Sequence, residues 1–220
     1  MLTKTPVRRP EIFKHLRDSQ LRRLMAISKP ENCKAGEIIF SAHDIGDKFF
    51  GVESGRVRIF TQANRREKTL AYIEAGDFFG EMALLDGKHR SASAQALVDT
   101  KLMVVNKTAF RKLLADTDFT IKLLDTLTRR LREADREIES LLFQNMLGRL
   151  ARAIIKLAGP EKTHKASLHM TLRELANYIG TTREPLSRAM ASLKRCGLID
   201  YQEKTLQIKN YRRLAAIGQN

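Results

Sequence analysis

The sequence predicts an α+β protein with an N-terminal antiparallel β-barrel of the jelly-roll type, a long central helix and a C-terminal module of short helices. Residues 34–105 alternate short apolar runs with glycines, and residues 124–141 carry a sustained heptad pattern. Residues 171–196 read as two short helices around a tight turn. At 220 residues and 43% hydrophobic, the chain can bury a substantial core.

The barrel is expected within residues 1–118. Runs such as GEIIF, RVRIF, TLAYI and KLMVV have strand length and are rich in β-branched and aromatic residues. Glycine turns separate them, and such short local connections favour antiparallel pairing over a parallel sheet. Before the strands, Ser19–Ile27 has helical spacing with Ser19 as its N-cap.

Residues 119–144 are expected to form one long helix that ends in a hinge. Its apolar residues are spaced three and four apart without an intervening glycine or proline, which is the pattern of a coiled-coil seam. Because the 3.5-residue period is sustained, we favour a homodimer over a helix that only covers its own domain. The predicted seam consists of Leu124, Leu127, Leu131, Ala134, Ile138 and Leu141.

Residues 145–220 are expected to form a separate domain. Asn145 can cap a first helix, which the pair Gly159-Pro160 would end. Further on, Thr171 and Thr182 can each cap a short helix, with a glycine at the turn between the two. Two strands follow, around a polar turn near Glu203-Lys204. This order predicts a winged helix-turn-helix.

The charge distribution supports double-stranded DNA as the partner of this domain. The chain has a net charge of +15, and residues 145–220 hold 14 Lys and Arg against 5 Asp and Glu. The second helix of such a motif presents its N-terminal residues to base edges, where arginine can bind guanine and a carboxylate can accept from cytosine. The predicted DNA-binding residues are Thr171, Thr182, Arg183, Glu184, Ser187, Arg188 and, near phosphates in the wing, Lys204.

A second informative segment is GDFFGEMALLDGKHRSASAQA, residues 76–96. Backbone N–H groups near Gly80 and Glu81 can form a nest for an anion. Arg90 can add a charge-assisted fork to the same anion. An alternative is that Glu81 and Arg90 only form an ion pair that braces a turn.

Both segments resemble a known family. The sequence TTREPLSR resembles the recognition helix of the Crp/Fnr (catabolite-activator) family of transcription regulators, and the resemblance covers almost the entire chain. Arg183-Glu184 with Arg188 is similar to the catabolite activator, whereas Glu184-x-x-Ser187-Arg188 is similar to the anaerobic regulators. The resemblance implies a dimer that binds a palindromic operator and RNA polymerase under the control of a small effector.

Residues 76–96 resemble the phosphate-binding cassette of cyclic-nucleotide-binding domains, with F-G-E, a hydrophobic turn and then R-[ST]-A. This resemblance implies that Arg90 binds the cyclic phosphate, Glu81 accepts from the ribose 2′-hydroxyl and Ser91 donates to a phosphate oxygen. The implied ligand-binding residues are Gly80, Glu81, Met82, Ala83, Arg90, Ser91, Ala92 and Asp135.

The identity of the base depends on Ala134 and Asp135. Alignment on Arg129-Arg130-Leu131 places them where relatives that bind cyclic AMP carry Thr and Ser, which contact adenine across the dimer. Ala134 cannot form a hydrogen bond through its side chain. An ionised Asp135 only accepts, from adenine N6–H or from guanine N1–H and N2–H together. Cyclic AMP and cyclic GMP are therefore both possible ligands. Alternatively, Asp135 is only an exposed charge at an e position of the coiled coil.

Other sensor chemistries have less support from the sequence. An iron–sulfur cluster needs four thiolates, and the chain has only Cys33 and Cys196, whose roles the sequence leaves open. No metal is expected. Haem bound through His43 or His89 is an alternative effector. A ligand-independent regulator that uses its barrel only to dimerise is another.

Two further classes are not expected from the sequence. It contains no G-x-S-x-G, P-loop or metal-ligand spacing, so we do not expect an enzyme. It also has no run approaching the ~20 apolar residues that span a bilayer, and no signal-like N-terminus. We therefore expect a cytoplasmic protein without a membrane partner.

Overall fold

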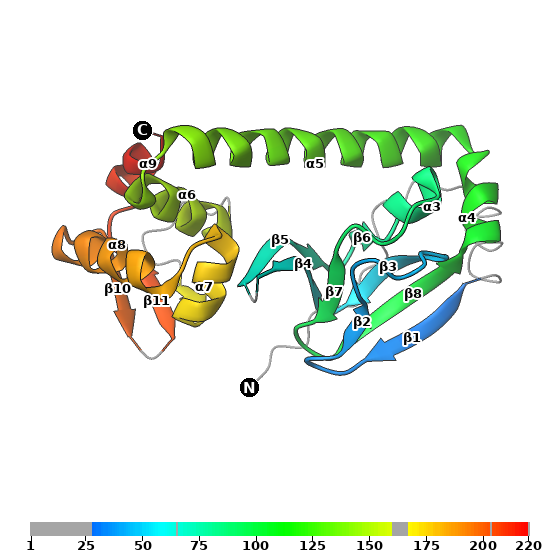
Figure 1. Cartoon of the computed structure of the whole chain (residues 1–220), viewed down its shortest axis with the longest axis horizontal. Coiled ribbons are helices and arrows are strands. Elements are labelled where there is room, and N and C mark those ends of the chain that lie inside the picture. Colours follow the sequence, from blue (N-terminus) through cyan, green and yellow to red (C-terminus); the bar gives the residue numbers. More distant parts are fainter. Residues whose placement is uncertain (1–27, 65, 160–166, 203, 220) are drawn as a thin grey trace. The chain divides into compact units, whose positions relative to one another are not determined.

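The computed structural model describes residues 28–64, 66–159, 167–202 and 204–219 (Figure 1). They form two compact units. The first contains the described residues up to Thr61 together with Thr69–Arg130, and the second contains Gln62–Lys68 and the chain from Leu131 onward. The expected helix at Ser19–Ile27 lies outside the described residues, and the expected domain boundaries at 118/119 and 144/145 stay predictions.

The N-terminal strands form two four-stranded sheets, ordered β1-β8-β3-β6 and β2-β7-β4-β5. Pairs β1–β8, β3–β8, β3–β6, β2–β7 and β4–β7 are antiparallel. This confirms the predicted α+β class with antiparallel N-terminal sheets. The strands are β1 (Lys29–Cys33), β2 (Ile38–Phe40), β3 (Lys48–Ser54), β4 (Arg56–Ala63), β5 (Arg66–Glu74), β6 (Phe78–Phe79), β7 (Ser93–Ala96) and β8 (Thr100–Asn106).

Strand alternation divides the apolar side chains of this unit between two cores. On β3, the neighbours Phe49 and Phe50 are both buried but belong to different clusters, because successive side chains point to opposite faces of a strand. Phe50 packs among residues of both sheets, such as Val57 and Leu102. Phe49 stacks on Phe110 of α4 (Lys107–Leu114), with ring centroids 5.1 Å apart.

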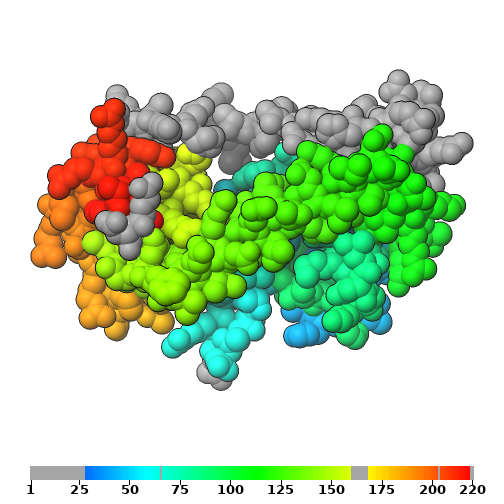
Figure 2. All heavy atoms as spheres, turned by 90° about the horizontal axis from the view of Figure 1, so that it is seen from above, coloured from blue at the N-terminus to red at the C-terminus, as the bar shows by residue number. Residues whose placement is uncertain are grey.

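The long helix α5 (Thr117–Phe143) begins in the second of these cores. Phe119 and Leu123 are fully buried there, and Leu127 packs against the same cluster. Farther along, α5 continues without interruption to Phe143, and Figure 2 shows its side chains as a green band that faces the viewer. The prediction of one long continuous helix is therefore confirmed.

The residues of the predicted seam differ in their surroundings, and the seam itself stays a prediction. Five of its six residues are exposed, namely Leu124, Leu131, Ala134, Ile138 and Leu141, and Leu141 also lines a cavity with residues of α6. Leu127 is half-buried and packs against the core of the first unit. Exposed residues with three-four spacing form a stripe on α5 that begins at Ile121, one turn before the predicted seam. Two of its members, Thr128 and Asp135, are polar. This exposed stripe consists of Ile121, Leu124, Thr128, Leu131, Asp135, Ile138 and Leu142.

The C-terminal unit contains the predicted helix-turn-helix and its wing. Its core joins Leu150 and Ile154 to residues of every later helix, among them Leu175, Leu186 and Leu214. A third strand and a last helix were not predicted. The elements are α6 (Met146–Ala158), β9 (Ser167–His169), α7 (Leu172–Ile179), α8 (Arg183–Arg195), β10 (Ile199–Gln202), β11 (Thr205–Ile208) and α9 (Tyr211–Gln219), with sheet order β10-β11-β9.

Two searches of the described residues were negative. No helix among them combines the length and apolarity needed to cross a membrane. Within the same residues, no three His, Cys, Asp or Glu side chains are grouped so as to hold a metal ion.

Candidate functional site

The cassette predicted from the sequence folds as a turn between β6 and the short helix α3 (Met82–Asp86). Gly80 has φ +83°, a conformation that favours glycine. A Cβ atom at this position would also lie 2.9 Å from Arg90 Nη1. Gly80 therefore allows the backbone to turn and the Arg90 guanidinium to approach it closely.

The cassette residues line a cavity of about 180 Å³ in the first unit. Its polar end is formed by the cassette, and its apolar end by β4 and β5 through Ile59, Leu70, Ala71 and Ile73. A ligand with one anionic and one planar apolar part matches this division. The predicted ligand residues in the lining are Gly80, Glu81, Met82, Ala83, Arg90, Ser91 and Ala92.

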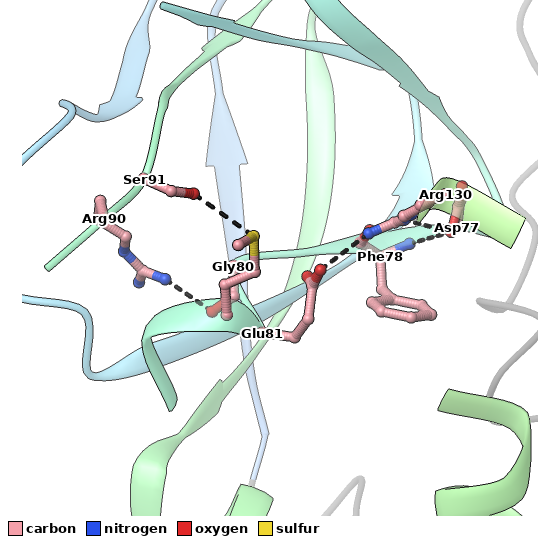
Figure 3. A network of polar contacts seen from close by, with 8 residues as sticks. Asp77, Phe78, Gly80, Glu81, Arg90, Ser91 and Arg130 are labelled. Atoms are coloured by element: carbon pink, nitrogen blue, oxygen red, sulfur yellow. Dashed lines mark hydrogen bonds and ion pairs between the residues drawn. The ribbon is translucent and has the colours of Figure 1, made fainter. Parts of the chain in front are cut away.

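Arg90 is the buried cation of this cavity, with only 5% of its surface exposed. Nη1 donates to the Gly80 carbonyl at 2.7 Å (Figure 3). Nη2 donates to the Lys48 carbonyl at 2.8 Å, and the guanidinium lies over the Phe40 ring. Burial lowers the pKa of Arg90, and the negative charge of Asp47 opposes this shift. Its Nε is also buried, and no described residue accepts from it. A buried donor without a partner is costly, so this nitrogen favours an anion in the cavity.

Glu81 lies on the other side of the turn and is 4% exposed. Its Oε1 accepts from Arg130 Nη1 of α5 at 3.1 Å, and Arg130 Nη2 donates to Asp77 Oδ1 at 3.0 Å and to the Phe78 carbonyl at 2.6 Å (Figure 3). Burial raises the pKa of Glu81, and the positive charge of Arg130 opposes the shift. The alternative in which Glu81 and Arg90 form an ion pair has no such contact among the described residues, where Arg130 is the ion-pair partner of Glu81.

Arg130 is the site residue that the sequence reasoning missed. It served there only to align the central helix, whereas in the structure it lines the cavity. Its spacing held a usable signal, because Arg130 is seven residues after the buried Leu123 and so lies on the inward face of α5.

The remaining ligand residues differ in their surroundings. Ser91 is exposed, and its hydroxyl lies 3.5 Å from Met82 Sδ. Asp135 lies on the exposed stripe of α5, in the second unit, while the other seven predicted ligand residues gather in the first. Neither His43 nor His89 is among the cavity-lining residues.

In the helix-turn-helix, Thr171 and Glu174 form a complete capping box at the start of α7. Glu174 N donates to Thr171 Oγ1 at 3.1 Å, and Thr171 N donates to Glu174 Oε2 at 2.6 Å. Gly180 ends α7 at φ +76°. Thr182 is the N-cap of α8 as predicted, but its side chain makes no capping hydrogen bond.

The start of α8 presents charges to solvent. Arg183, Glu184 and Arg188 are exposed and line one open hollow with Ser187, while Leu186 is buried in the core. Among described residues, none of these three charged side chains has a hydrogen bond or ion pair. Unpaired charges at a helix start are typical of a surface that binds another charged molecule.

The wing places Lys204 at the turn between β10 and β11. Its φ of +69° lies in the left-handed region, although it is not a glycine. Its carbonyl accepts from Met170 N at 2.8 Å, which holds the turn against the strand end. Glu203, the other residue of the predicted turn, lies outside the described residues.

Comparison with known proteins agrees with both halves of the chain. Residues 30–117 match the cyclic nucleotide-binding domain and residues 148–217 the Crp-like helix-turn-helix domain. The chain is 36% identical to the cyclic AMP receptor protein of Thermus thermophilus, over 79% of this chain and 81% of that one. It is 28% identical to a CRP-like cAMP-activated global transcriptional regulator of Mycobacterium tuberculosis, over 94% and 96% of the two chains.

Solved structures show the same fold. The catabolite activator protein of Thermus thermophilus is 32% identical and aligns over 95% of this chain and 98% of its own, with a TM-score of 0.55. The c-di-GMP responsive regulator CLP of Xanthomonas campestris has a TM-score of 0.77 at 22% identity, over 87% and 99% of the two chains, which shows similarity of fold.

The fold and the two sites define a DNA-binding transcription regulator with a cyclic-nucleotide-binding domain. The chain belongs to the Crp/Fnr family, whose members are transcription regulators rather than enzymes and act as dimers.

Proposed function

We propose that this protein is a dimeric regulator whose affinity for a palindromic operator is controlled by a cyclic nucleotide, cyclic AMP or cyclic GMP, bound in the cassette cavity. The observation that carries this proposal is the buried Nε of Arg90, which has no partner among the described residues. A cyclic phosphate would supply the missing acceptor and the missing negative charge.

Each part of a cyclic nucleotide has a counterpart in the cavity. Arg90, Ser91 and the backbone near Gly80 would hold the phosphate. Arg130 donates to Oε1 of Glu81, so Oε2 remains to accept from a ribose 2′-hydroxyl. The base would lie at the apolar end, where side chains such as Ile59 offer no hydrogen bonds.

The choice between the two bases then depends on a residue beyond the barrel. We assign it to Asp135, which would accept from adenine N6–H or, with two bonds, from guanine N1–H and N2–H. Relatives named for cyclic AMP favour the first, and an acceptor-only side chain favours the second.

On the DNA side, Arg183, Glu184 and Arg188 would read base edges in the major groove, and Lys204 would bind a phosphate. The exposed stripe of α5 would pair two copies and set their recognition helices ~34 Å apart, the distance between successive major grooves. Binding of RNA polymerase is part of the same proposal. Nucleotide and operator affinities are then reciprocally coupled.

Titration calorimetry with cyclic AMP and cyclic GMP tests this proposal. Arg90→Ala should weaken binding of the preferred nucleotide by about 100-fold, because a charge-assisted fork is lost. Arg111→Ala, at an exposed arginine of α4, is the matched control and should bind as the wild type does. If the wild type releases no heat with either nucleotide, Arg90 only braces the turn and the regulator acts without a nucleotide.

A further inference from the structure

The last helix, α9, has an interface with α6 that leaves little room for a side chain at two positions. A Cβ atom on Gly218 would lie 3.0 Å from Arg152 N, and one on Gly148 would lie 3.3 Å from the Ile217 carbonyl oxygen. One turn before Gly218, the fully buried Leu214 anchors α9 in the core of the C-terminal unit. The two helices are therefore packed closely against each other.

The N-terminal end of α9 is tied to the end of the recognition helix. Leu198 comes directly after the turn that ends α8, and its carbonyl accepts from Lys209 N at 2.8 Å and from Asn210 N at 3.2 Å. Asn210 then caps α9, because its Oδ1 accepts from Arg213 N at 3.1 Å. Backbone hydrogen bonds therefore connect the end of α8 to the start of α9.

The C-terminal end of α9 is tied to the junction of α5 and α6. Gln144 stands between these helices, and its Nε2 donates to the Gly218 carbonyl at 2.9 Å. Its Oε1 accepts from the buried Ser140 hydroxyl of α5 at 2.6 Å. With the amide reversed, Oε1 would face the Gly218 carbonyl oxygen, so Gly218 fixes the orientation of the amide.

We propose that α9 is a strut that fixes the orientation of the recognition helix relative to the end of α5, and that Gln144 is its positioning residue. The strut itself is a property of the fold. Only its expected effect on operator binding rests on the proposed function. Neither the capping of α6 by Asn145 nor the core of the unit requires the Gln144 amide.

A distance measurement within one chain tests the strut without nucleotide or DNA. Spin labels on the exposed native Cys196, after α8, and on Glu139→Cys, exposed on α5, report the relative position of the two helices. Labelled protein is mixed with a large excess of unlabelled protein, so that each dimer holds one labelled chain. The buried Cys33 should remain unlabelled, since burial raises the pKa of its thiol to about 11.

We expect one narrow distance distribution in the parent protein and a broad or shifted one in Gln144→Glu, whose carboxylate would face the Gly218 carbonyl. Gly218→Ala should act similarly, because its methyl group would lie 3.0 Å from Arg152 N and α9 must shift against α6 to accommodate it. Ser140→Ala is the control and should keep the narrow distribution, since the bond from Gln144 to Gly218 remains. Unchanged distributions in both Gln144→Glu and Gly218→Ala would overturn the strut.

Operator binding gives the second readout. With nucleotide present, Gln144→Glu should bind the operator about fivefold more weakly, in line with the loss of one hydrogen bond. Its nucleotide affinity without DNA should stay at the wild-type value. A wild type that binds no operator would refute the proposed function, and the distance measurement would still decide on the strut.

Discussion

The cassette and the start of α8 both depend on arginines, but they use them in opposite ways. In the cassette, Arg90 and Arg130 bond to backbone carbonyls, and Arg130 also bonds to two carboxylates of its own chain. At the start of α8, Arg183 and Arg188 are exposed and have no partner among the described residues. The first arginines are part of the fold, whereas the second are exposed and available to a partner molecule.

This difference has a physical consequence. Removing a charge from a buried network leaves its former partner unpaired in a poorly solvated place, which costs folding free energy. Removing an exposed, unpaired charge costs the fold almost nothing. Substitutions in the cassette should therefore change stability and ligand binding together, and those on α8 should change DNA binding alone.

The largest effect on stability is expected for Arg130→Ala. It leaves the 4%-exposed Glu81 without its cation and should lower the free energy of unfolding by about 2–3 kcal/mol near pH 7. Arg132→Ala, at an exposed neighbour on α5, is the control and should stay within about 0.5 kcal/mol of the wild type in urea denaturation.

The pH dependence of this loss follows from Glu81. Burial already raises its pKa above the ordinary value of 4.5, and Arg130 opposes the rise, so the variant should raise it further. A carboxyl whose pKa is higher when folded binds more protons in the folded state, so stability falls as pH increases above 4.5. The deficit of Arg130→Ala should therefore shrink as the pH is lowered toward that value. A constant deficit would mean that Glu81 is not the group left unpaired.

On the other side of the comparison, Arg188→Ala should lower operator affinity by about 1–3 kcal/mol and relax the preference at one base pair. Its urea midpoint should match that of the wild type, because the side chain is exposed. Arg195→Ala, exposed in the last turn of α8, is the control for charge alone. Fluorescence anisotropy with operator variants measures the preference, and an unchanged preference would place the recognition surface elsewhere.

How well the sequence predicted each region depends on whether its signal is local. Caps, the turn glycine and the first-turn charges of α8 are neighbours in sequence, so the amino-acid pattern was enough to locate the helix-turn-helix. The cassette glycine and arginine are also close in sequence. By contrast, the contact of Arg130 with Asp77 joins residues 53 positions apart, and no local pattern indicates such a partner.

The seam shows the same limit. Leu127 and Leu124 look equivalent in a heptad pattern, because both fit three-four spacing. Only the core around Phe49 and Phe110 of α4 shows that Leu127 turns inward. Likewise, α9 was not predicted, because what holds it in place is contact with α6, through Leu214 and two glycines far apart in sequence.

An intermediate effect is expected at Asp135, an exposed charge without a described partner. On the exposed stripe it occupies an a position, where the same residue of both chains meets in a parallel dimer. Two carboxylates in that place repel by about 1 kcal/mol. Asp135→Asn should therefore tighten the dimer in sedimentation equilibrium, and salt should tighten the wild type more than the variant. Glu139→Gln, exposed on the same helix but outside the stripe, is the control.

The smallest effect is expected at Lys204, which combines an exposed charge for a partner with a backbone conformation that affects the stability of the fold. Its exposed charge should bind a phosphate, and its left-handed backbone should strain the wing turn. Lys204→Asn removes the charge and tolerates φ +69° better, so the variant should be as stable as the wild type or slightly more stable. Operator and random duplexes should both bind more weakly, and the slope of log affinity against log salt should decrease by about one. A loss confined to the operator would instead mean that Lys204 contacts a base, because a phosphate contact weakens all duplexes alike.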